Sequence, residues 1–442
     1  MSTVDTDTIA AVATAPGRGG VGIVRVSGPL TPKIANALTG RKLPPRSAVY
    51  CGFRDGEGAA LDRGIAIHFE APNSLTGEDV LELQAHGGPV VLDMLLGRVL
   101  SLGARRADPG EFTQRAFVNG KLDLAQAEAV LDLVNSATRQ AARGAVRSLS
   151  GEFSKHVHAI AHEVLELRVF CEGAIDFPDE DIDFLSESDV GERLASARKR
   201  LSKLRARARQ GALLKDGLNV VIAGAPNVGK SSLLNRLSGE DRAIVTSVPG
   251  TTRDTLDADF DLDGMPVRVV DTAGLRDTGD AVETEGINRA HRAMAAADVV
   301  LWVVDDREAG GSPGGDACTG AATIIVRNKA DLSGRRPGSI SPGAVRICAL
   351  TGEGVDALAT EIKQAAGYRA GEGIFTARAR HLDALAAADT ALAAAAERLV
   401  ANYGELVAED LRDAHDHLGA IVGRVSADDL LGEIFASFCI GK

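Results

Sequence analysis

The stretch GAPNVGKS, Gly224–Ser231, is the strongest indication of fold in the central part of this chain. It matches the pattern G-x-x-x-x-G-K-[ST] and lies between an apolar run typical of a strand and the segment Ser231–Leu237, which predicts a helix. Glycines let backbone N–H groups wrap around phosphate oxygens, and a helix N-terminus adds positive partial charge. We expect Lys230 to reach the β- and γ-phosphates of a nucleotide and the Ser231 hydroxyl to bind Mg²⁺. The stretch therefore predicts a phosphate-binding loop (P-loop) in an α/β domain.

Apolar, β-rich runs recur on both sides of this loop. They are Leu218–Ala223, Val267–Val270, Val299–Val304, Thr323–Arg327 and Val345–Ile347. Because helical stretches separate most of them, they predict βαβ units and a parallel sheet. The segment Gly310–Gly320 is rich in glycine and predicts a surface loop. We expect residues 217–370 to form a single α/β domain.

Two further motifs follow predicted strands. In DTAG, Asp271–Gly274, the aspartate is expected to hold Mg²⁺ through water and the Gly274 N–H to sense the γ-phosphate. In NKAD, Asn328–Asp331, the carboxylate of Asp331 is expected to accept hydrogen bonds from the guanine N1 and 2-amino groups, a donor edge that adenine lacks. A site built on such pairing rejects the analogue without it by several orders of magnitude. Three motifs in this order predict that the domain binds GTP with Mg²⁺ and hydrolyses it.

The segment between the P-loop and DTAG predicts a switch loop. It contains GTTRD, Gly250–Asp254, where Thr252 is expected to supply the second Mg²⁺ hydroxyl. Further on, Cys348 and Ala349 occupy the place of a fifth guanine-contacting loop, in which Ser-Ala is usual. We expect the cysteine to be a mild departure because that loop works largely through its backbone.

The residue after DTAG excludes one mechanism of hydrolysis. Ras-like proteins orient water with a glutamine at this place, whereas this chain has Leu275, so another water-positioning group is needed. Asn227 in the P-loop can coordinate a cation beside the phosphates, and a monovalent ion there would replace an arginine finger, which is worth roughly 10³–10⁵ in rate. The nearest downstream carboxylates are Asp277, Asp280, Glu283 and Glu285.

The regions flanking the α/β domain differ from each other in pattern. Residues 1–120 are typical of an α+β fold, with a predicted helix from Gly88 to about Leu102. The predicted strands there are Ala10–Ala13, Gly22–Val26, Gly64–Phe69 and Asp79–Gln84. From Lys121 to about Cys171, and again from about Thr376 to the end, apolar residues recur at helical spacing. The simplest layout is a multidomain chain with four segments: an α+β domain (1–120), a helical domain in two parts (121–216 and 371–442), and a P-loop GTPase domain (217–370) inserted between these parts.

A basic helix follows the acidic loop Asp176–Asp189. Its apolar residues recur in a 3-4-3-4 pattern typical of helix-on-helix packing, at Leu194, Ala197, Leu201, Leu204 and Ala208. Its basic residues are Arg193, Arg198, Lys199, Arg200, Lys203, Arg205, Arg207 and Arg209. They form either a solvated face opposite that stripe, the simpler interpretation, or a surface that faces RNA. His158 and His162 share a face of the preceding helix without a nearby third ligand, which favours helix polarity over a metal site.

Composition narrows the class of protein. The chain has 442 residues and a formal net charge of -12, so its surface as a whole repels nucleic acid and any RNA contact must be local. Its five cysteines have no CxxC spacing, which argues against a disulfide framework or a zinc site and for a reducing compartment. The N-terminus lacks the basic region of a signal peptide, and no run of about 18 apolar residues predicts a membrane span. We therefore expect a cytoplasmic protein.

The motifs together resemble the MnmE (TrmE) family of tRNA-modification GTPases over the whole chain. Besides the P-loop, GTTRD, DTAG and NKAD, the resemblance rests on GIVRVSG (22–28), DVLELQ (79–84), HGGP (86–89), KLDLAQAE (121–128) and the terminal FCIGK (438–442). It implies a K⁺-activated GTPase that dimerises through its N-terminal domain. It also implies a heterotetramer with the flavoprotein MnmG, which brings FAD and NADH. Together they would add a carboxymethylaminomethyl or aminomethyl group to C5 of the wobble uridine of certain tRNAs.

The resemblance also implies roles for individual residues. It implies K⁺ binding by Asn227, Thr246, Val248 and Thr251, and it matches Glu283 to a water-orienting glutamate. It implies contacts of Arg25, Glu82, Lys121 and Lys442 with 5,10-methylene- or 5-formyl-tetrahydrofolate. With the motifs, it implies GTP contacts from Asn227, Val228, Gly229, Lys230, Ser231, Ser232, Thr246, Ser247, Val248, Pro249, Gly250, Thr251, Asp271, Thr272, Ala273, Gly274, Asn328, Lys329, Ala330 and Asp331.

The terminal cysteine allows two interpretations. Cys439 stands in the C-a-a-X position, but a final lysine is unusual for prenylation. An apolar tail, Leu430–Ile440, fits docking near the folate better. A catalytic thiol and an inert packing thiol both remain open.

A second class of function also fits the P-loop domain. A binding switch, such as a ribosome-assembly GTPase whose flanking domains only grip RNA, would share the nucleotide motifs. Tandem GTPase domains or a basic RNA-binding C-terminus would favour it, and this sequence has neither.

Overall fold

The computed structural model describes residues 7–176, 189–239, 257–271, 296–308, 321–369, 374–401, 403–424 and 428–441. The chain divides into two compact units. One comprises Met1–Leu131 with Leu418–Lys442, and the other comprises Asp132–His417.

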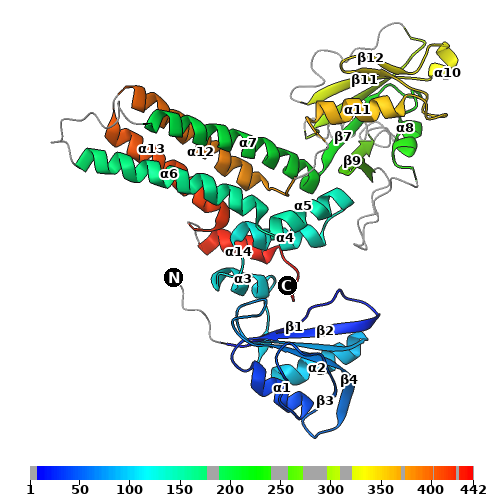
Figure 1. Cartoon of the computed structure of the whole chain (residues 1–442). Helices are drawn as coiled ribbons and strands as arrows, with labels where there is room; N and C mark the ends of the chain where they lie inside the picture. The colour runs from blue at the N-terminus through cyan, green and yellow to red at the C-terminus, as the bar shows by residue number, and fades with distance from the viewer. Residues whose placement is uncertain are drawn as a thin grey trace, which may run out of the picture. The chain divides into compact units, whose positions relative to one another are not determined.

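The first unit contains a six-stranded sheet in the order β3-β4-β5-β2-β1-β6 (Figure 1). Its strands are β1 (Ile9–Val12), β2 (Gly19–Ser27), β3 (Val49–Arg54), β4 (Ala60–Phe69), β5 (Val80–Gly87) and β6 (Arg105–Arg106). All pairs are antiparallel except β1 with β6. The predicted strands are confirmed, with ends shifted by up to four residues, whereas β3 and β6 were not predicted.

Two helices pack against this sheet and bury its apolar core. They are α1 (Thr31–Thr39), which was not predicted, and α2 (Pro89–Ser101), which confirms the predicted helix. Alternate residues of the strands point inward, so that Val24 and Val26 of β2 and Leu81 and Leu83 of β5 are buried with Leu95 of α2. The opposite alternation on β2 and β5 places polar side chains such as Arg25 and Glu82 on the other face.

The C-terminal tail returns to this first unit. Helices α3 (Glu111–Val118), α4 (Leu124–Val134) and α14 (Asp428–Ala436) contribute to one apolar cluster, which includes Leu124, Phe435 and Phe438. Ile440 forms a β-bridge with Pro109. Gly441 has φ +94°, and a Cβ there would lie 2.4 Å from the Val12 carbonyl oxygen, so only glycine lets the tail lie this close to β1.

The second unit contains the long helices. They are α5 (Arg139–Leu149), α6 (Glu152–Asp176), α7 (Val190–Asp216), α12 (Ala379–Val400) and, as far as His417, α13 (Gly404–Val422). Figure 1 shows α7 and α12 side by side, and the predicted apolar stripe of α7, from Leu194 to Ala208, is buried. The helical pattern predicted from Lys121 to Cys171 forms three helices. One break comes at Thr138, whose hydroxyl caps α5 by accepting from the Ala141 N–H.

A seven-stranded sheet completes the second unit, in the order β12-β13-β11-β10-β7-β9-β8. Its strands are β7 (Leu218–Gly224), β8 (Asp257–Leu262), β9 (Met265–Asp271), β10 (Val299–Asp305), β11 (Ala322–Asn328), β12 (Gly338–Ser341) and β13 (Ala344–Arg346). Its helices are α8 (Lys230–Leu237), α10 (Ala330–Ser333) and α11 (Val355–Ala365). The five central strands are parallel, as predicted, and the edge strands β8 and β12 are antiparallel. The carboxyl ends of the parallel strands therefore share one edge, where open α/β sheets bind ligands.

The two connections between this sheet and the long helices lie against each other. Gly211 near the end of α7 packs on the returning chain so tightly that a Cβ there would lie 1.9 Å from the Phe375 carbonyl oxygen. Ser148 of α5 donates a hydrogen bond to the Thr376 carbonyl oxygen over 3.0 Å. Neighbouring ends are the geometry that an inserted domain requires.

Candidate functional site

The P-loop connects β7 to α8. Lys230 is buried, and its Nζ donates to the carbonyl oxygens of Gly224 and Ala225 over 3.0 and 2.8 Å, so the ammonium group lies inside the curve of the loop. Gly224 has φ +144°, and a Cβ there would lie 2.2 Å from the Val303 carbonyl oxygen. Backbone conformation and lack of space both require glycine at this position. The arrangement fits a triphosphate with Mg²⁺, because a cation and a helix N-terminus converge on one concave loop.

Asn328, the first residue of NKAD, joins the P-loop to the loop after β13. Its side-chain Nδ2 donates to the Val228 carbonyl oxygen over 2.9 Å, and its Oδ1 accepts from the Ala349 N–H over 3.0 Å. The side chain is buried. A Cβ on Gly229 would lie 2.2 Å from that Nδ2 atom. The predicted phosphate and guanine loops are therefore held together by one amide group.

Lys329 makes a second link. Its Nζ donates to the Asn227 carbonyl oxygen over 2.7 Å and to Asp305 Oδ2 over 3.0 Å. Hydrogen bonds from Arg307, together with the one from Lys329, hold the pKa of Asp305 well below its ordinary value despite burial. Asp305 was not predicted from the sequence. The sequence feature that could have identified Asp305 is a carboxylate directly after the apolar run of β10, at the ligand-binding edge of the sheet.

Asp331 contacts the residue that departs from the usual Ser-Ala. The Sγ of Cys348 donates to Asp331 Oδ1 over 3.2 Å, and Cys348 is buried. The Ala349 N–H donates to Asn328, and the contact made by the Cys348 side chain was not expected. Arg236 of α8 supports the same loop by donating to the Ala349 carbonyl oxygen over 3.2 Å.

Several predicted nucleotide residues lie outside the described residues. They are Thr246, Ser247, Val248, Pro249, Gly250, Thr251, Thr252, Thr272, Ala273, Gly274 and Glu283, together with Leu275. Lys442 and the loop Gly310–Gly320 also lie outside them. Asp271 ends β9, next to Ile222 of β7, so its backbone lies at the same edge as the P-loop, but its side chain is not described. Ser231 and Ser232 lie in the first turn of α8.

The predicted folate residues Arg25 and Glu82 face each other on neighbouring strands. Nε and one terminal nitrogen of Arg25 donate to Glu82 Oε1 over 3.1 and 3.0 Å. The other terminal nitrogen donates to the Gly441 carbonyl oxygen over 3.1 Å, and the guanidinium lies 5.8 Å from the centre of the Phe112 ring. Arg25 thus connects two strands to the C-terminal tail. No described group contacts Glu82 Oε2.

The two other residues of this predicted site differ in position. Lys121 donates to the Pro72 carbonyl oxygen over 3.0 Å and has no described contact with Arg25 or Glu82. Cys439 is exposed, and its carbonyl oxygen accepts from the Gly110 N–H over 3.4 Å. The tail therefore holds the thiol at the surface of the first unit.

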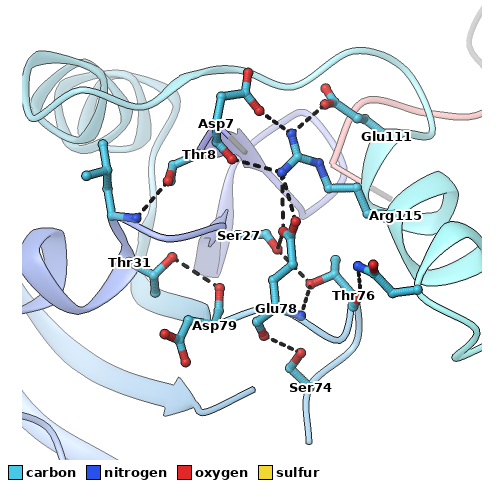
Figure 2. A network of polar contacts seen from close by, with 12 residues as sticks. Asp7, Thr8, Ser27, Thr31, Ser74, Thr76, Glu78, Asp79, Glu111 and Arg115 are labelled. Carbon is cyan, nitrogen blue, oxygen red and sulfur yellow. Dashed lines mark hydrogen bonds and ion pairs between the residues drawn. The ribbon is translucent and has the colours of Figure 1, made fainter. Parts of the chain in front are cut away.

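An ionic network anchors the same unit, as Figure 2 shows. Arg115 is buried and donates to Asp7 over 2.5 Å, to Glu111 over 2.9 Å and to Glu78 over 3.2 Å. Ser27 of β2 donates to Glu78 over 2.6 Å. Burial by itself raises the pKa of Glu111, but hydrogen bonds from Arg105, the Asp108 N–H and Arg115 outweigh it and hold that pKa below its usual value. The network fixes α3 to the first residues of the sheet.

Four of the eight basic side chains predicted on α7 pair with acidic residues among the described part of the chain. Arg193 contacts Glu166 over 3.0 Å, and Arg200 contacts Glu163 over 2.8 Å, both on α6. This pairing fits the simpler interpretation for that part of the helix. His162 pairs with Glu166 over 3.3 Å, and the described part of the chain holds no cluster of three or more histidine, cysteine or acidic residues arranged to bind a metal ion.

A parallel sheet with a P-loop after β7 and NKAD after β11 defines the class of protein, a P-loop GTPase. Comparison with known proteins then identifies the family. The family model "MnmE helical domain" matches residues 124–439, and the model "GTP-binding protein TrmE N-terminus" matches residues 8–121. The chain belongs to the MnmE family of tRNA modification GTPases.

Individual relatives extend over the whole chain. It is 53% identical to the tRNA modification GTPase MnmE of Pseudomonas paraeruginosa, with 99% of each chain covered. It is 55% identical to that of Azoarcus sp., covering 99% of this chain and 98% of the relative. Among solved structures, Era from Aquifex aeolicus bound to GDP and AlF4⁻ is 26% identical over 39% of this chain and 66% of that chain, with a TM-score of 0.27. A TM-score this low carries no argument.

Within the described ranges, none of the helices is both long and apolar enough to span a bilayer.

Proposed function

We propose that this chain is a K⁺-activated GTPase that acts as a cytoplasmic homodimer with the flavoprotein MnmG. Together they would add a carboxymethylaminomethyl or aminomethyl group to C5 of the wobble uridine of certain tRNAs, with a folate-borne one-carbon unit. Family membership supports the tRNA modification. The observation that carries the GTPase role is the Asn328 amide, which contacts both the P-loop and the loop that follows β13. In this proposal the domains are residues 1–120, 121–216, 217–370 and 371–442.

At the phosphates, this chain supplies charge and orientation. Lys230, already inside the loop, would move its hydrogen bonds from the Gly224 and Ala225 carbonyls to phosphate oxygens. Ser231 and Thr252 would hold Mg²⁺, which neutralises charge on the β- and γ-phosphate oxygens when bound. Asp331 would read the guanine donor edge. The links made by Asn328 and Lys329 would keep the distance between phosphate and guanine loops fixed.

Hydrolysis would depend on a monovalent cation. Asn227 has φ +62° and an exposed side chain, and its carbonyl oxygen is held by Lys329. Its side-chain oxygen, with Thr246, Val248 and Thr251, would hold K⁺ against the phosphates. Glu283 would orient the attacking water, because Leu275 has no polar group to do so.

In the N-terminal unit, the residues support an anion-binding and pterin-binding site beside the tail. Both hydrogen bonds that Arg25 donates to Glu82 end on Oε1, so Oε2 can accept from the donor-rich edge of a pterin. Arg25 would supply positive charge for the glutamate tail of 5,10-methylene- or 5-formyl-tetrahydrofolate, and Lys121 and Lys442 would also contact this ligand. Cys439 at the surface of the same tail is the candidate thiol, and FAD and NADH would act on the partner.

The experiment is nucleoside mass spectrometry of tRNA. A strain that lacks its own MnmE is complemented with this chain or with its Lys230→Ala variant. We expect the wild-type chain to restore the C5-modified wobble uridine and the variant to fail. Restoration by neither chain, with both present at wild-type level, would contradict the proposed function.

A further inference from the structure

An open groove of about 930 Å³ lies in the second unit where α7, the end of α11 and the start of α12 meet. Four arginines line it: Arg205, Arg207, Arg209 and Arg369. Among the described residues of the lining, Asp383 is the single acid. None of the described lining residues is aromatic, so the groove offers charge and hydrogen-bond donors without a surface on which bases stack.

Two of these arginines have charges that the described residues do not neutralise. Arg205 pairs with Asp389 over 3.3 Å and Arg207 with Glu152 over 3.0 Å. Arg209 and Arg369 are exposed, and among the described residues neither has an acidic partner. Their positive charge is therefore available to an anionic ligand.

Gln210 links the two backbone segments that carry these arginines. Gln210 follows Arg209 on α7, its Nε2 donates to the Gly367 carbonyl oxygen over 2.8 Å, and its Oε1 accepts from the backbone N–H of Arg369 over 2.7 Å. Leu214 of α7 and Tyr368 are both buried in the apolar cluster of the seven-stranded sheet. The two walls of the groove are thus joined by hydrogen bonds and by a shared core, so the backbone segments that carry the two arginines are held at a fixed spacing.

We propose that this groove binds the phosphate backbone of an RNA, a proposal that rests on tRNA being the substrate. Guanidinium groups bind phosphate oxygens in a bidentate way and remain charged at every physiological pH. A chain of net charge -12 repels RNA over most of its surface, so contact is favoured where arginines converge on a concave site. Without aromatic or base-reading groups, the groove positions the RNA and does not read its sequence.

The test measures tRNA binding by the full-length protein through fluorescence anisotropy at several salt concentrations. The groove variants are Arg209→Gln with Arg369→Gln, and Arg209→Glu with Arg369→Glu. The control is Lys203→Glu, a charge reversal at an exposed residue of the same helix outside the groove lining. Because each lost phosphate contact lowers binding by about tenfold at about 0.1 M salt, we expect the double glutamine variant to bind roughly 10–100-fold more weakly. Its slope of log affinity against log salt should fall by about 1.4–1.8.

The expected pattern includes an unchanged GTPase rate and unfolding temperature in all variants, and near-normal RNA affinity in the control. Wild-type affinity in both groove variants would overturn the proposal. An equal loss in the control would do so too, because the effect would then be general surface charge. Displacement of tRNA by inorganic phosphate at matched ionic strength, with chloride inactive, would assign the groove to small anions instead.

The cellular assay separates this proposal from the proposed function. If the wild-type chain restores wobble-uridine modification and the groove variants restore it equally, only the groove proposal fails. If the wild-type chain restores nothing, the proposed function fails, and the anisotropy result still decides whether the groove binds RNA.

Discussion

The thiol of Cys348 donates a hydrogen bond to Asp331 Oδ1, across 3.2 Å, in the loop pair that is expected to hold guanine. A carboxylate that accepts from a fixed donor on one oxygen has fewer orientations to lose when a base binds. We therefore expect Cys348 to position Asp331 through its side chain.

Substitution of Cys348 tests how much its side chain contributes to nucleotide binding. Cys348→Ala removes the donor and should raise the Kd for GDP by about fivefold, since a hydrogen bond is worth roughly 0.5–1.5 kcal/mol and a thiol is a weak donor. Cys348→Ser keeps a donor and should bind GDP at least as well as the wild type. Isothermal titration with GDP and ADP measures both affinity and selectivity. Equal GDP affinity in the alanine and serine variants would show that the contact is idle.

Gly229→Ala should abolish nucleotide binding while leaving most of the sheet folded. A Cβ at this residue would lie 2.2 Å from Asn328 Nδ2, so the amide would have to leave its place between the loops. Gly334→Ala is the matched control, because Gly334 also has positive φ, +69°, but a Cβ there would meet no atom within 4 Å. It should lose about 1 kcal/mol of stability and keep its affinity for GDP. Loss of binding in both variants would point to backbone strain alone.

Potassium should stimulate GTP hydrolysis by at least about tenfold over sodium at equal ionic strength. The reason is the cation site predicted at Asn227, which stands in for an arginine finger worth roughly 10³–10⁵ in Ras-like proteins. Asn227→Ala should remove the difference between the two salts and still bind GDP. The rate of phosphate release in KCl and in NaCl measures this stimulation. Equal wild-type rates in the two salts would refute the proposed cation site.

Acid should loosen the N-terminal unit through Glu111 and Asp7. Their pKa values in the folded chain lie below the ordinary 4.5 and 3.8, so the stabilisation is complete at pH values above those and is lost as the pH falls through the lowered values. Hydrogen exchange of β1 amides, corrected for intrinsic rates, should therefore be constant from pH 7 to about 5 and rise below about 4.5.

Glu111→Gln tests that assignment. It should weaken protection of β1 already at neutral pH, because Arg105 and Arg115 lose a charged acceptor, and it should flatten the acid dependence. Asp93→Asn is the control, since the Asp93 side chain is 78% exposed and lies 3.8 Å from Arg106. An unchanged acid dependence in the Glu111 variant would mean that other carboxylates govern this unit.

Removal of Lys442 should spare GTP hydrolysis and abolish wobble-uridine modification. Arg25 holds the tail that carries Lys442 by donating a hydrogen bond to the Gly441 carbonyl oxygen. In the sequence, this tail lies outside the P-loop domain. Arg25→Ala should give the same split by releasing the tail. Phosphate release and tRNA nucleoside analysis on one preparation measure the two activities. Modification that survives in the Lys442 deletion would show that the C-terminal residue has no part in it.

Local sequence patterns were sufficient to predict the central strands of the P-loop domain. Apolar runs followed by GKS and NKAD predicted β7, β11 and α8 within one residue at each end, because parallel strands are buried on both faces and their ends are marked by glycine and polar residues. Spacing did not predict α1 or β3. These elements have short, mixed patterns, and their place depends on packing against strands distant in the sequence.

Contacts between residues that are far apart in the sequence depend on the tertiary structure. Arg25 and Gly441 are separated by most of the chain, and Asn328 and Val228 by 100 residues, yet each pair shares a hydrogen bond. Arg209 and Arg369 are also far apart in the sequence, and the hydrogen bonds of Gln210 bring their backbone segments to one groove. A periodic pattern records the face of an element that is buried, but a contact between elements depends on the path of the chain between them. The chemistry expected of each motif therefore comes from the sequence, and the partners of its described side chains are decided by the fold.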